Sequence, residues 1–285
     1  MYESYLQLIE NTLSQCLPHP IGALEIAADI ISYSLEGGGK RVRPLLCLLF
    51  CEAAGGNPEN ARYFAAAIEY VHTYSLIHDD MPCMDNDDFR RSKPTVHRQF
   101  GEGNALLIGD AMLTEAFMIA AKAAEEKCVD INDCLRAIRE LSFFSGLSGM
   151  VGGQILDIAS EGKALTGDML LTLDALKTGG LIEAACVLGC IAGGADNTKI
   201  EAARSFGKNL GLAFQITDDL LEYENDQENS DERNQKATYI SVFGYERSKE
   251  FAEKYTDEAI RSLNPFGQNA SAIITLANRL LHRRK

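Results

Sequence analysis

Short cysteine motifs are missing from this 285-residue chain. Its eight cysteines include no Cys-x-x-Cys pair, so the spacing typical of a zinc site or a dithiol redox centre is absent. We expect no apolar run of the length that a transmembrane helix needs. The N-terminus has no basic start or signal core, and the tail carries no lipidation cysteine. These absences predict a soluble, cytoplasmic protein with no stable membrane insertion.

Positive charge is also scarce, and this limits the partners of the protein. Asp and Glu number 41 against 27 Lys and Arg, which gives a formal charge of −14. Such a field repels nucleic acid unless a basic face is segregated. It would also repel a free diphosphate, so such a ligand would need a bridging metal ion. Cys47/Cys51 and Cys186/Cys190 are four residues apart in apolar stretches, which indicates buried free thiols and a reducing compartment.

Alternating strands, Pro- or Ser-rich linkers and internal repeats are missing as well, whereas the 3.6-residue hydrophobic period is found almost throughout. Turn residues mark the expected breaks at 37–39, 55–58, 82, 152–153 and 193–194. The pattern therefore predicts one all-α domain spanning residues 1–285. The expected helices cover residues 2–15, 20–36, 43–54, 59–80, 103–125, 130–146, 167–176, 179–192, 197–222, 236–262 and 268–283.

The first of two carboxylate clusters ends an otherwise apolar helical stretch and contains Asp79, Asp80 and Asp85. Clustered carboxylates repel one another and resist desolvation, and hard oxygen ligands of this kind suit Mg²⁺. Pro82 must end or kink the helix, and the bend could return Asp85 towards Asp79. His72 lies seven residues before Asp79, on the same helical face. A solvated helix end is the alternative, but the apolar neighbours weaken it.

The second cluster is a stripe on one predicted helix. Gln215, Asp218, Asp219 and Glu222 follow the i, i+3, i+4, i+7 spacing, which places them on one face. Acids at this spacing destabilise a helix unless a cation intervenes. A solvated acidic face is the alternative, and the apolar residues around the stripe favour a face that binds metal.

A basic segment follows three glycines at residues 37–39 and contains Lys40, Arg41 and Arg43. Pro44 suits the first turn of a helix, so these cations lie at a helix N-terminus, where the dipole disfavours them. A bound anion would remove that conflict, although an ordinary basic loop is the alternative. With the two acidic clusters, the segment indicates a magnesium-dependent enzyme acting on diphosphates. No Walker loop is present.

In combination these motifs resemble the trans-prenyltransferases, the head-to-tail polyprenyl diphosphate synthases, and the bacterial farnesyl diphosphate synthases among them most closely. The resemblance runs from about Gly37 to Gly244 and follows the order of motifs in the family. It implies an isoprenoid synthase fold, with antiparallel helices around a deep apolar cavity, and a homodimer. The matching stretches are Gly-Gly-Lys-Arg-x-Arg-Pro, Asp-Asp-x-x-x-x-Asp followed by Arg90-Arg91, Gly153-Gln154, Lys177-Thr178, Phe214-Gln215 and Lys236-x-Thr-Tyr.

The resemblance also implies roles for individual residues. The catalytic residues would be Asp79, Asp80, Asp85, Asp218, Asp219 and Lys177. Three Mg²⁺ ions would be bound directly by Asp79, Asp85 and Asp218, with Asp80, Asp219 and Glu222 in support. Isopentenyl diphosphate would be bound by Lys40, Arg43, His72 and Arg91. The allylic diphosphate would be bound by Arg90, Lys177, Thr178, Gln215 and Lys236. The diphosphate group of the allylic substrate would leave as an allylic carbocation forms, and the double bond of isopentenyl diphosphate would attack that cation. A proton would then be lost to the departing diphosphate.

Two departures from the family pattern leave alternatives open. Glu222 stands where the second motif usually has aspartate, and residues 225–235 lack a lysine that the family usually carries there. Lys177, Arg233 or Lys236 would have to compensate. A weakly catalytic partner subunit of another synthase is therefore one alternative. A terpene cyclase is another, although the Lys40, Arg43 and His72 set counts against it.

Product length is the last expectation from the sequence. In the family, the positions five and four before the first aspartate form the floor of the chain cavity, and here they are Tyr74 and Ser75. A tyrosine at the first of these resembles short-chain bacterial farnesyl diphosphate synthases. We therefore expect farnesyl diphosphate (C15), with geranylgeranyl diphosphate (C20) as the alternative.

Overall fold

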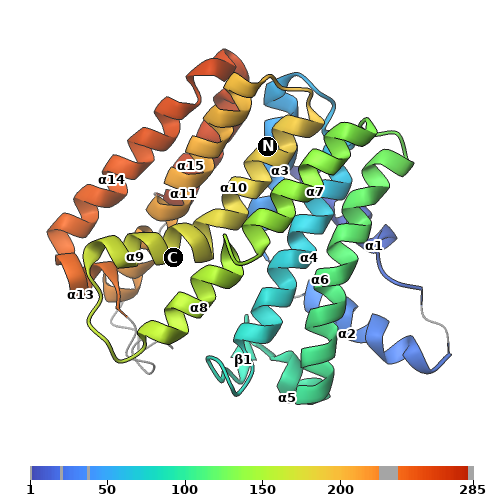
Figure 1. The fold of residues 1–285 in the computed structure, drawn as a ribbon, viewed down its shortest axis with the longest axis horizontal. Helices are drawn as coiled ribbons and strands as arrows, with labels where there is room; N and C mark the ends of the chain where they lie inside the picture. The colour runs from blue at the N-terminus through green and yellow to red at the C-terminus, as the bar shows by residue number, and fades with distance from the viewer. Residues whose placement is uncertain (1, 20–21, 37–38, 225–236, 282–285) are drawn as a thin grey trace.

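The computed structural model describes residues 2–19, 22–36, 39–224 and 237–281. Nearly all regular structure in these ranges is helical, which confirms the all-α prediction (Figure 1). The elements are α1 Glu3–Gln15, η1 Gly22–Leu24, α2 Glu25–Leu35, α3 Val42–Ala54, η2 Pro58–Ala61, α4 Arg62–Asp79, β1 Phe89–Arg90, β2 Lys93–Pro94, α5 Val96–Phe100, α6 Glu102–Glu125, α7 Ile131–Ser145, α8 Met150–Ser160, α9 Gly167–Asp174, η3 Ala175–Gly179, α10 Gly180–Ala192, α11 Asn197–Glu224, α13 Tyr239–Phe243, α14 Tyr245–Ser262, η4 Asn264–Ala270 and α15 Ser271–Leu281.

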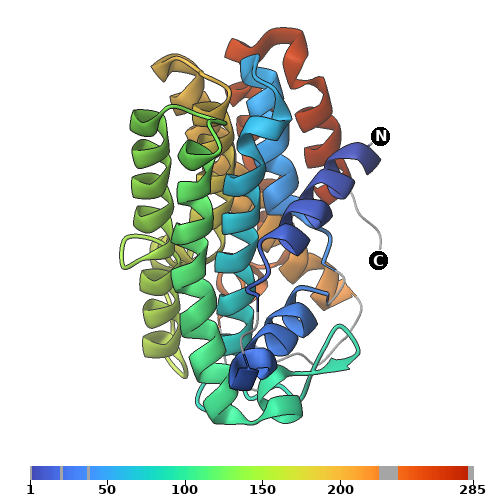
Figure 2. The same cartoon turned by 90° about the vertical axis from the view of Figure 1, so that its right-hand side faces the viewer.

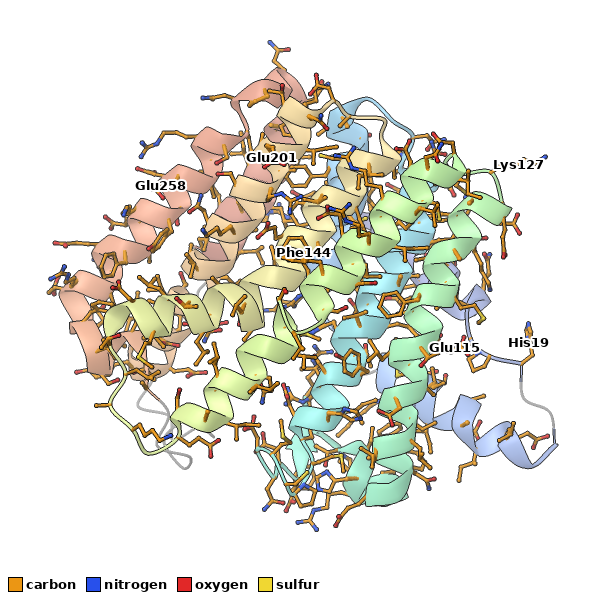
Figure 3. The ribbon with its side chains drawn as sticks, in the orientation of Figure 1. His19, Glu115, Lys127, Phe144, Glu201 and Glu258 are labelled. Atoms are coloured by element: carbon orange, nitrogen blue, oxygen red, sulfur yellow. The ribbon has the colours of Figure 1, made fainter. Side chains whose placement is uncertain are left out.

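Helix α10 forms the centre of the bundle because, apart from Glu183 in its first turn, it is apolar on every side. It packs against α3, α7 and α11, and α4 lies between α3 and α6. The long helices run side by side in both views, with α14 and α15 along one side of the bundle and α6 and α7 along the other (Figures 1 and 2). Charged side chains such as Lys127 and Glu201 point outwards, whereas Phe144 is buried between helices (Figure 3).

Glycines allow α10 to lie close against α3. A β-carbon at Gly189 would lie 2.1 Å from the carbonyl oxygen of Cys47, and one at Gly193 would lie 2.5 Å from that of Cys51. Cys186 and Cys190 on α10 are buried there with the two α3 cysteines, and all eight cysteines of the chain are free. Burial raises the pKa of these four thiols. The prediction of buried free thiols is therefore confirmed.

Two predicted helix breaks are wrong. Gly152 and Gly153 lie inside α8, a helix that the periodicity did not predict. A β-carbon at Gly153 would lie 2.6 Å from the α-carbon of Lys177, so this glycine allows a close helix contact and does not end a helix. The expected gap between residues 176 and 179 is also continuous, because the π-helical turn η3 joins α9 to α10. The short α5 and the β1–β2 hairpin were not predicted either.

The expectation that no segment has the length and apolarity of a membrane span is also wrong. By length and composition, two segments of the described chain pass that test, Glu102–Glu125 and Gly167–Ala192. Most of the second segment is buried in the bundle. Core helices pass the same test, and α6, the first segment, packs along α4.

Candidate active site

The first acidic cluster lies where α4 ends. The helix stops at Asp79, three residues before Pro82, as the missing amide of proline predicts. The chain then turns back, and the amide of Asp85 donates a 2.9 Å hydrogen bond to the carbonyl oxygen of Asp79. Asn86 adopts a left-handed conformation in this turn, with φ of 54°. The predicted return of Asp85 to Asp79 is therefore confirmed for the backbone.

Asp80 faces a different part of the molecule from Asp79. Its carboxylate is buried and accepts three hydrogen bonds from Arg90, at 2.8 and 3.0 Å from Nε and 2.6 Å from Nη2. Asp80 and Arg90 line a pocket at the β1–β2 hairpin. Asp79 instead lines a cavity of about 360 Å³ between α4 and α8, called the central cavity below. This fork-shaped ion pair anchors the hairpin to the end of α4.

A cluster of cations lies beside the central cavity. Arg43 Nη1 is 3.5 Å from His72 Nε2, and the Nε atom of Arg43 is buried without a hydrogen-bond partner in the described part of the chain. Arg91 reaches the same place over Gly39, where a β-carbon would lie 2.7 Å from its Nη1. Burial and the surrounding guanidinium groups hold the pKa of His72 well below its usual value. Burial also lowers the pKa of Arg43. The cluster is therefore ready to bind an anion.

The four residues predicted for the isopentenyl site do not lie equally deep. Arg43 and His72 line the central cavity, whereas Lys40 and Arg91 are exposed and do not line it. Arg41, a neighbour in sequence, faces away from the cavity and forms ion pairs with Glu10 and Glu69. The expectation that all three cations of the basic segment face one anion is therefore wrong for Arg41.

The π-helical turn η3 presents Lys177 and Thr178 to the site. Lys177 Nζ donates to Asp157 Oδ2 on α8 at 2.5 Å, and the Thr178 hydroxyl donates to Gln215 Oε1 on α11 at 3.2 Å. Helix α11 can lie this close because Gly211 faces η3, where a β-carbon would lie 2.5 Å from the α-carbon of Gly179. The turn thus connects the two helices on either side of it.

The second acidic cluster divides into two parts. Asp219 is buried, accepting a hydrogen bond from Gln215 Nε2 at 3.2 Å and one from the backbone amide of Tyr239 at 2.8 Å. Asp218 and Glu222 are partly exposed on the same helix. Asp219 therefore fixes the start of α13, beyond the part of the chain that is not described.

Sequence reasoning missed two buried acids in this region, Asp157 and Asp174. Burial and the nearby Asp219 raise the pKa of Asp174 to about 8, so this carboxyl is mostly protonated at neutral pH. Asp157 is the one acid of α8, and Asp174 ends α9, three positions before Lys177. That spacing, one helical turn from a predicted site residue, is the signal that could have identified Asp174.

Two adjoining cavities connect these groups. The larger, of about 360 Å³, is lined on the α4 side by Arg43, His72 and Asp79, and on the other side by α8. The smaller, of about 140 Å³, is lined by Gln215 and Asp219 together with the two acids described above. Lys177 and Thr178 line both cavities. One acid of each cluster, Asp79 or Asp219, therefore faces one of these two adjoining cavities.

Tyr74 and Ser75 both line the larger cavity, one turn before Asp79. The Tyr74 ring is buried and packs edge-on against His78, with ring centroids 5.7 Å apart. Its hydroxyl has no hydrogen-bond partner in the described part of the chain, and burial raises its pKa to about 12. Gly109 on α6 leaves the space that His78 fills, since a β-carbon there would lie 2.0 Å from His78 Nε2.

The carboxylates suit Mg²⁺ better than a metal that the protein alone must enclose. Among the described residues, no three His, Cys, Asp or Glu side chains form a complete metal site. Mg²⁺ is usually held by one or two carboxylates, with water and substrate phosphate as the other ligands. Asp79 and Asp85 at the end of α4, and the partly exposed Asp218 on α11, are carboxylates of this kind, and their role as metal ligands stays a prediction. Lys236 and Arg233 lie outside the described residues, so their predicted roles stay predictions.

Known proteins are similar to this chain in sequence. The model of the polyprenyl synthetase family matches residues 24–273. The farnesyl diphosphate synthase of Micrococcus luteus is 43% identical, over 96% of this chain and 95% of its own. A protein of Arabidopsis thaliana, the heterodimeric geranylgeranyl pyrophosphate synthase large subunit 1, is also 43% identical, over 90% of this chain and 71% of its own.

Solved structures share the fold. An apo FPP/GFPP synthase from Zymomonas mobilis has a TM-score of 0.89 and 37% identity, covering 99% of this chain and 97% of its own. The Helicobacter pylori geranyltransferase, complexed with magnesium and isoprenyl diphosphate, has a TM-score of 0.82 and 30% identity, covering 98% of this chain and 95% of its own. The isoprenoid synthase fold is thereby confirmed. The chain belongs to the polyprenyl synthetase family and is a prenyltransferase, a head-to-tail prenyl diphosphate synthase.

Proposed function

We propose that this enzyme condenses isopentenyl diphosphate with dimethylallyl and then geranyl diphosphate, and that it stops at farnesyl diphosphate. The buried ring of Tyr74 in the central cavity is the observation that supports this product. Tyr74 lies five residues before Asp79, about 7.5 Å along the helix axis. A hydrocarbon chain growing from a diphosphate at Asp79 would therefore meet this ring early.

The cation cluster is the proposed site of isopentenyl diphosphate. Arg43 and His72 would contact the diphosphate in the cavity, and the exposed Lys40 and Arg91, which do not line it, would contact the diphosphate from outside. Burial and nearby guanidinium charges lower the pKa of His72 and Arg43, and a bound diphosphate would neutralise those charges. Neutral His72 can donate or accept a hydrogen bond, which suits a ligand that carries both bridging and terminal oxygens.

The allylic diphosphate is proposed to lie across η3, between the two acidic clusters. Asp79, Asp85 and Asp218 would hold three Mg²⁺ ions, with Asp80, Asp219 and Glu222 in support. When bound, the metal ions supply Lewis-acid stabilisation of the departing diphosphate. The allylic diphosphate itself would be bound by Lys177, Thr178, Gln215, Arg90 and Lys236. Lys177 is already positioned by Asp157.

Product analysis with matched variants tests the proposed chain length. The wild-type enzyme, given Mg²⁺, dimethylallyl diphosphate and isopentenyl diphosphate, should release mainly C15 product on chromatography. Tyr74→Ala should shift the product to C20 or longer, because it removes the floor of the cavity. Tyr74→Phe should still give C15, since the ring is kept and only a hydroxyl without a described partner is lost. Mainly C20 product from the wild type would reject the proposal.

Two properties of the relatives favour the alternatives of a C20 product and of a partner subunit. Relatives at 40% and 43% identity are named geranylgeranyl diphosphate synthases, so the same chromatography decides between C15 and C20. One of them is named as a subunit of a heterodimer. If this chain were a weakly catalytic subunit, it would be nearly inactive alone and would change the turnover of a second synthase on mixing.

A homodimer in the cytoplasm is also proposed. Leu107 and Met118 on α6 are exposed, as are Leu135 and Phe143 on α7, so these two neighbouring helices carry apolar surface that a second copy could cover. Light scattering at micromolar concentration should give twice the mass of the chain. The eight free thiols fit a reducing compartment.

A further inference from the structure

Arg41 has a backbone conformation that a residue with a side chain seldom adopts. It caps the N-terminus of α3 with φ of 49° and ψ of 34°, in the left-handed region that favours glycine. Such a conformation is costly for a residue other than glycine and persists where neighbouring interactions over-determine it. Arg41 stands two residues after Gly39, over which Arg91 passes, and two residues before Arg43.

Four hydrogen bonds from the guanidinium group hold Arg41 in place. Its Nη1 donates to Glu69 Oε1 on α4 at 2.6 Å, and its Nη2 donates to the carbonyl oxygen of Leu35, at the end of α2, at 2.6 Å. Its Nε and Nη2 donate to the two carboxylate oxygens of Glu10 on α1, at 2.7 and 3.3 Å. One buried side chain thus connects α1, α2 and α4 to the first residue before α3.

Glu69 connects this network to the cation cluster. It lies on α4, one turn before His72, and its carboxylate is buried. Its charge favours the protonated forms of both Arg43 and Arg91. Glu69 therefore acts on the cluster in two ways, as a counter-charge and as the anchor of Arg41.

We propose that Arg41, held by Glu69 and Glu10, is a positioning residue that fixes the backbone from Gly39 to Arg43 for binding of isopentenyl diphosphate. This inference rests on the proposed site of that substrate. The ion-pair network does not contact the substrate; it holds Arg43 and the space for Arg91 in the geometry that the diphosphate needs. Helix α1, outside the cavity, thereby contributes to substrate affinity through Glu10.

The variant Glu69→Gln separates positioning from charge, because the two effects have opposite signs. If Glu69 acted only through its charge, its removal would make the cluster more positive and would tighten diphosphate binding. If it acts through Arg41, its removal loosens the α3 N-terminus and weakens binding. A decrease in affinity therefore supports positioning, and an increase or no change contradicts it.

The experiment compares KM for isopentenyl diphosphate with KM for geranyl diphosphate, each varied with the other saturating. Glu69→Gln and Arg41→Lys should each raise KM for isopentenyl diphosphate about tenfold, as expected when one charge-assisted contact is lost. KM for geranyl diphosphate should stay within about twofold, because a loss of fold alone would move both constants. Calorimetric titration with isopentenyl diphosphate reads the same affinity without turnover. If the wild type bound isopentenyl diphosphate but were inactive, the proposed reaction would be contradicted. The calorimetric affinities of the variants would then decide the inference by themselves.

Two further variants complete the test. Arg204→Lys is the matched control, because Arg204 also forms a partly buried network, with Glu140 and Glu183, but in the upper part of the bundle near Phe144 and Glu201 (Figure 3). It should leave KM for isopentenyl diphosphate unchanged. If Arg41→Lys does not fold, Glu10→Gln decides, since the Glu10 side chain is 52% exposed. A rise of about threefold supports the proposal, and an unchanged KM overturns it.

Discussion

The cationic and acidic sides of the cavity differ in how far their charges are balanced by partners within the protein. On the cationic side, Arg43 and Arg91 lie together with His72, and burial and mutual repulsion lower all three pKa values. On the acidic side, protein partners already hold several groups, as Arg90 does for Asp80 and Lys177 for Asp157. A bound anion would therefore stabilise the cationic side most. On the acidic side, ion pairs within the protein already hold several carboxylates in place for a metal ion and a diphosphate.

Replacing Asp79 should give the largest effect in either region. Asp79→Asn keeps the size of the side chain but removes the charge of a proposed direct Mg²⁺ ligand, so turnover should fall by about a thousandfold or more. Steady-state assays at saturating Mg²⁺ measure it. Asp257→Asn, at an exposed carboxylate on α14, is the control and should be silent. Near-normal turnover in Asp79→Asn would show that Asp79 is not a required Mg²⁺ ligand.

The cationic side should respond in binding rather than in turnover. Arg43→Met should raise KM for isopentenyl diphosphate about tenfold to a hundredfold, because a buried charge-assisted contact is lost. Lys40→Met should raise it only a few-fold, since Lys40 is exposed and solvent screens its charge. Substrate titrations on the two variants make the comparison. Equal effects would mean that depth in the cluster does not determine the contribution of each cation.

Sequence alone predicted most of the helices, though not α5 or α8, and the two acidic clusters, because these depend on local spacing. The return of Asp85 to Asp79 followed from Pro82, and the proposed face of the second cluster from the helical period. The continuation of α8 through Gly153 could not be predicted. The glycine is needed there only because Lys177, on another helical segment, packs against it. Local patterns cannot tell a glycine that ends a helix from one that lets two helices touch.

The partners of the buried charged residues could not be predicted from the sequence either. Asp80 looks like its neighbour Asp79, and only the hairpin residue Arg90 reveals that it faces elsewhere. Arg41 looks like Arg43, and its partners Glu10 and Glu69 lie 31 and 28 residues away. Long-range pairing of this kind is decided by how the helices pack, so residues with the same local pattern acquire different roles.

The Asp80–Arg90 pair offers a way to separate anchoring from metal binding on the acidic side. Asp80→Asn should lower the free energy of unfolding by about 1–3 kcal/mol, because a buried acceptor of charge-assisted hydrogen bonds is lost. Urea denaturation measures that change. The Mg²⁺ concentration for half-maximal activity should stay within about twofold if Asp80 acts mainly as the anchor of Arg90. A large rise in that concentration would instead make Asp80 a direct metal ligand.

The smallest expected effect concerns the pH dependence of stability on the cationic side. The folded protein holds the pKa of His72 well below the value near 6.5 that the unfolded chain would have. Between these two values the unfolded state binds more protons than the folded state, so the free energy of unfolding falls as the pH drops below about 6.5. One such group contributes about 1 kcal/mol between pH 6.5 and 5.5.

Urea denaturation of the wild type and of His72→Gln, at pH 7.5 and 5.5, measures the contribution of this one imidazole. The variant should lose about 1 kcal/mol less than the wild type on acidification, because its side chain cannot take up the proton. Exposed His19 provides the control, and His19→Gln should behave as the wild type does (Figure 3). Adding isopentenyl diphosphate should reduce the difference, since a bound anion favours the protonated imidazole. Equal losses in the wild type and His72→Gln would mean that burial and the neighbouring arginines do not lower the pKa of His72.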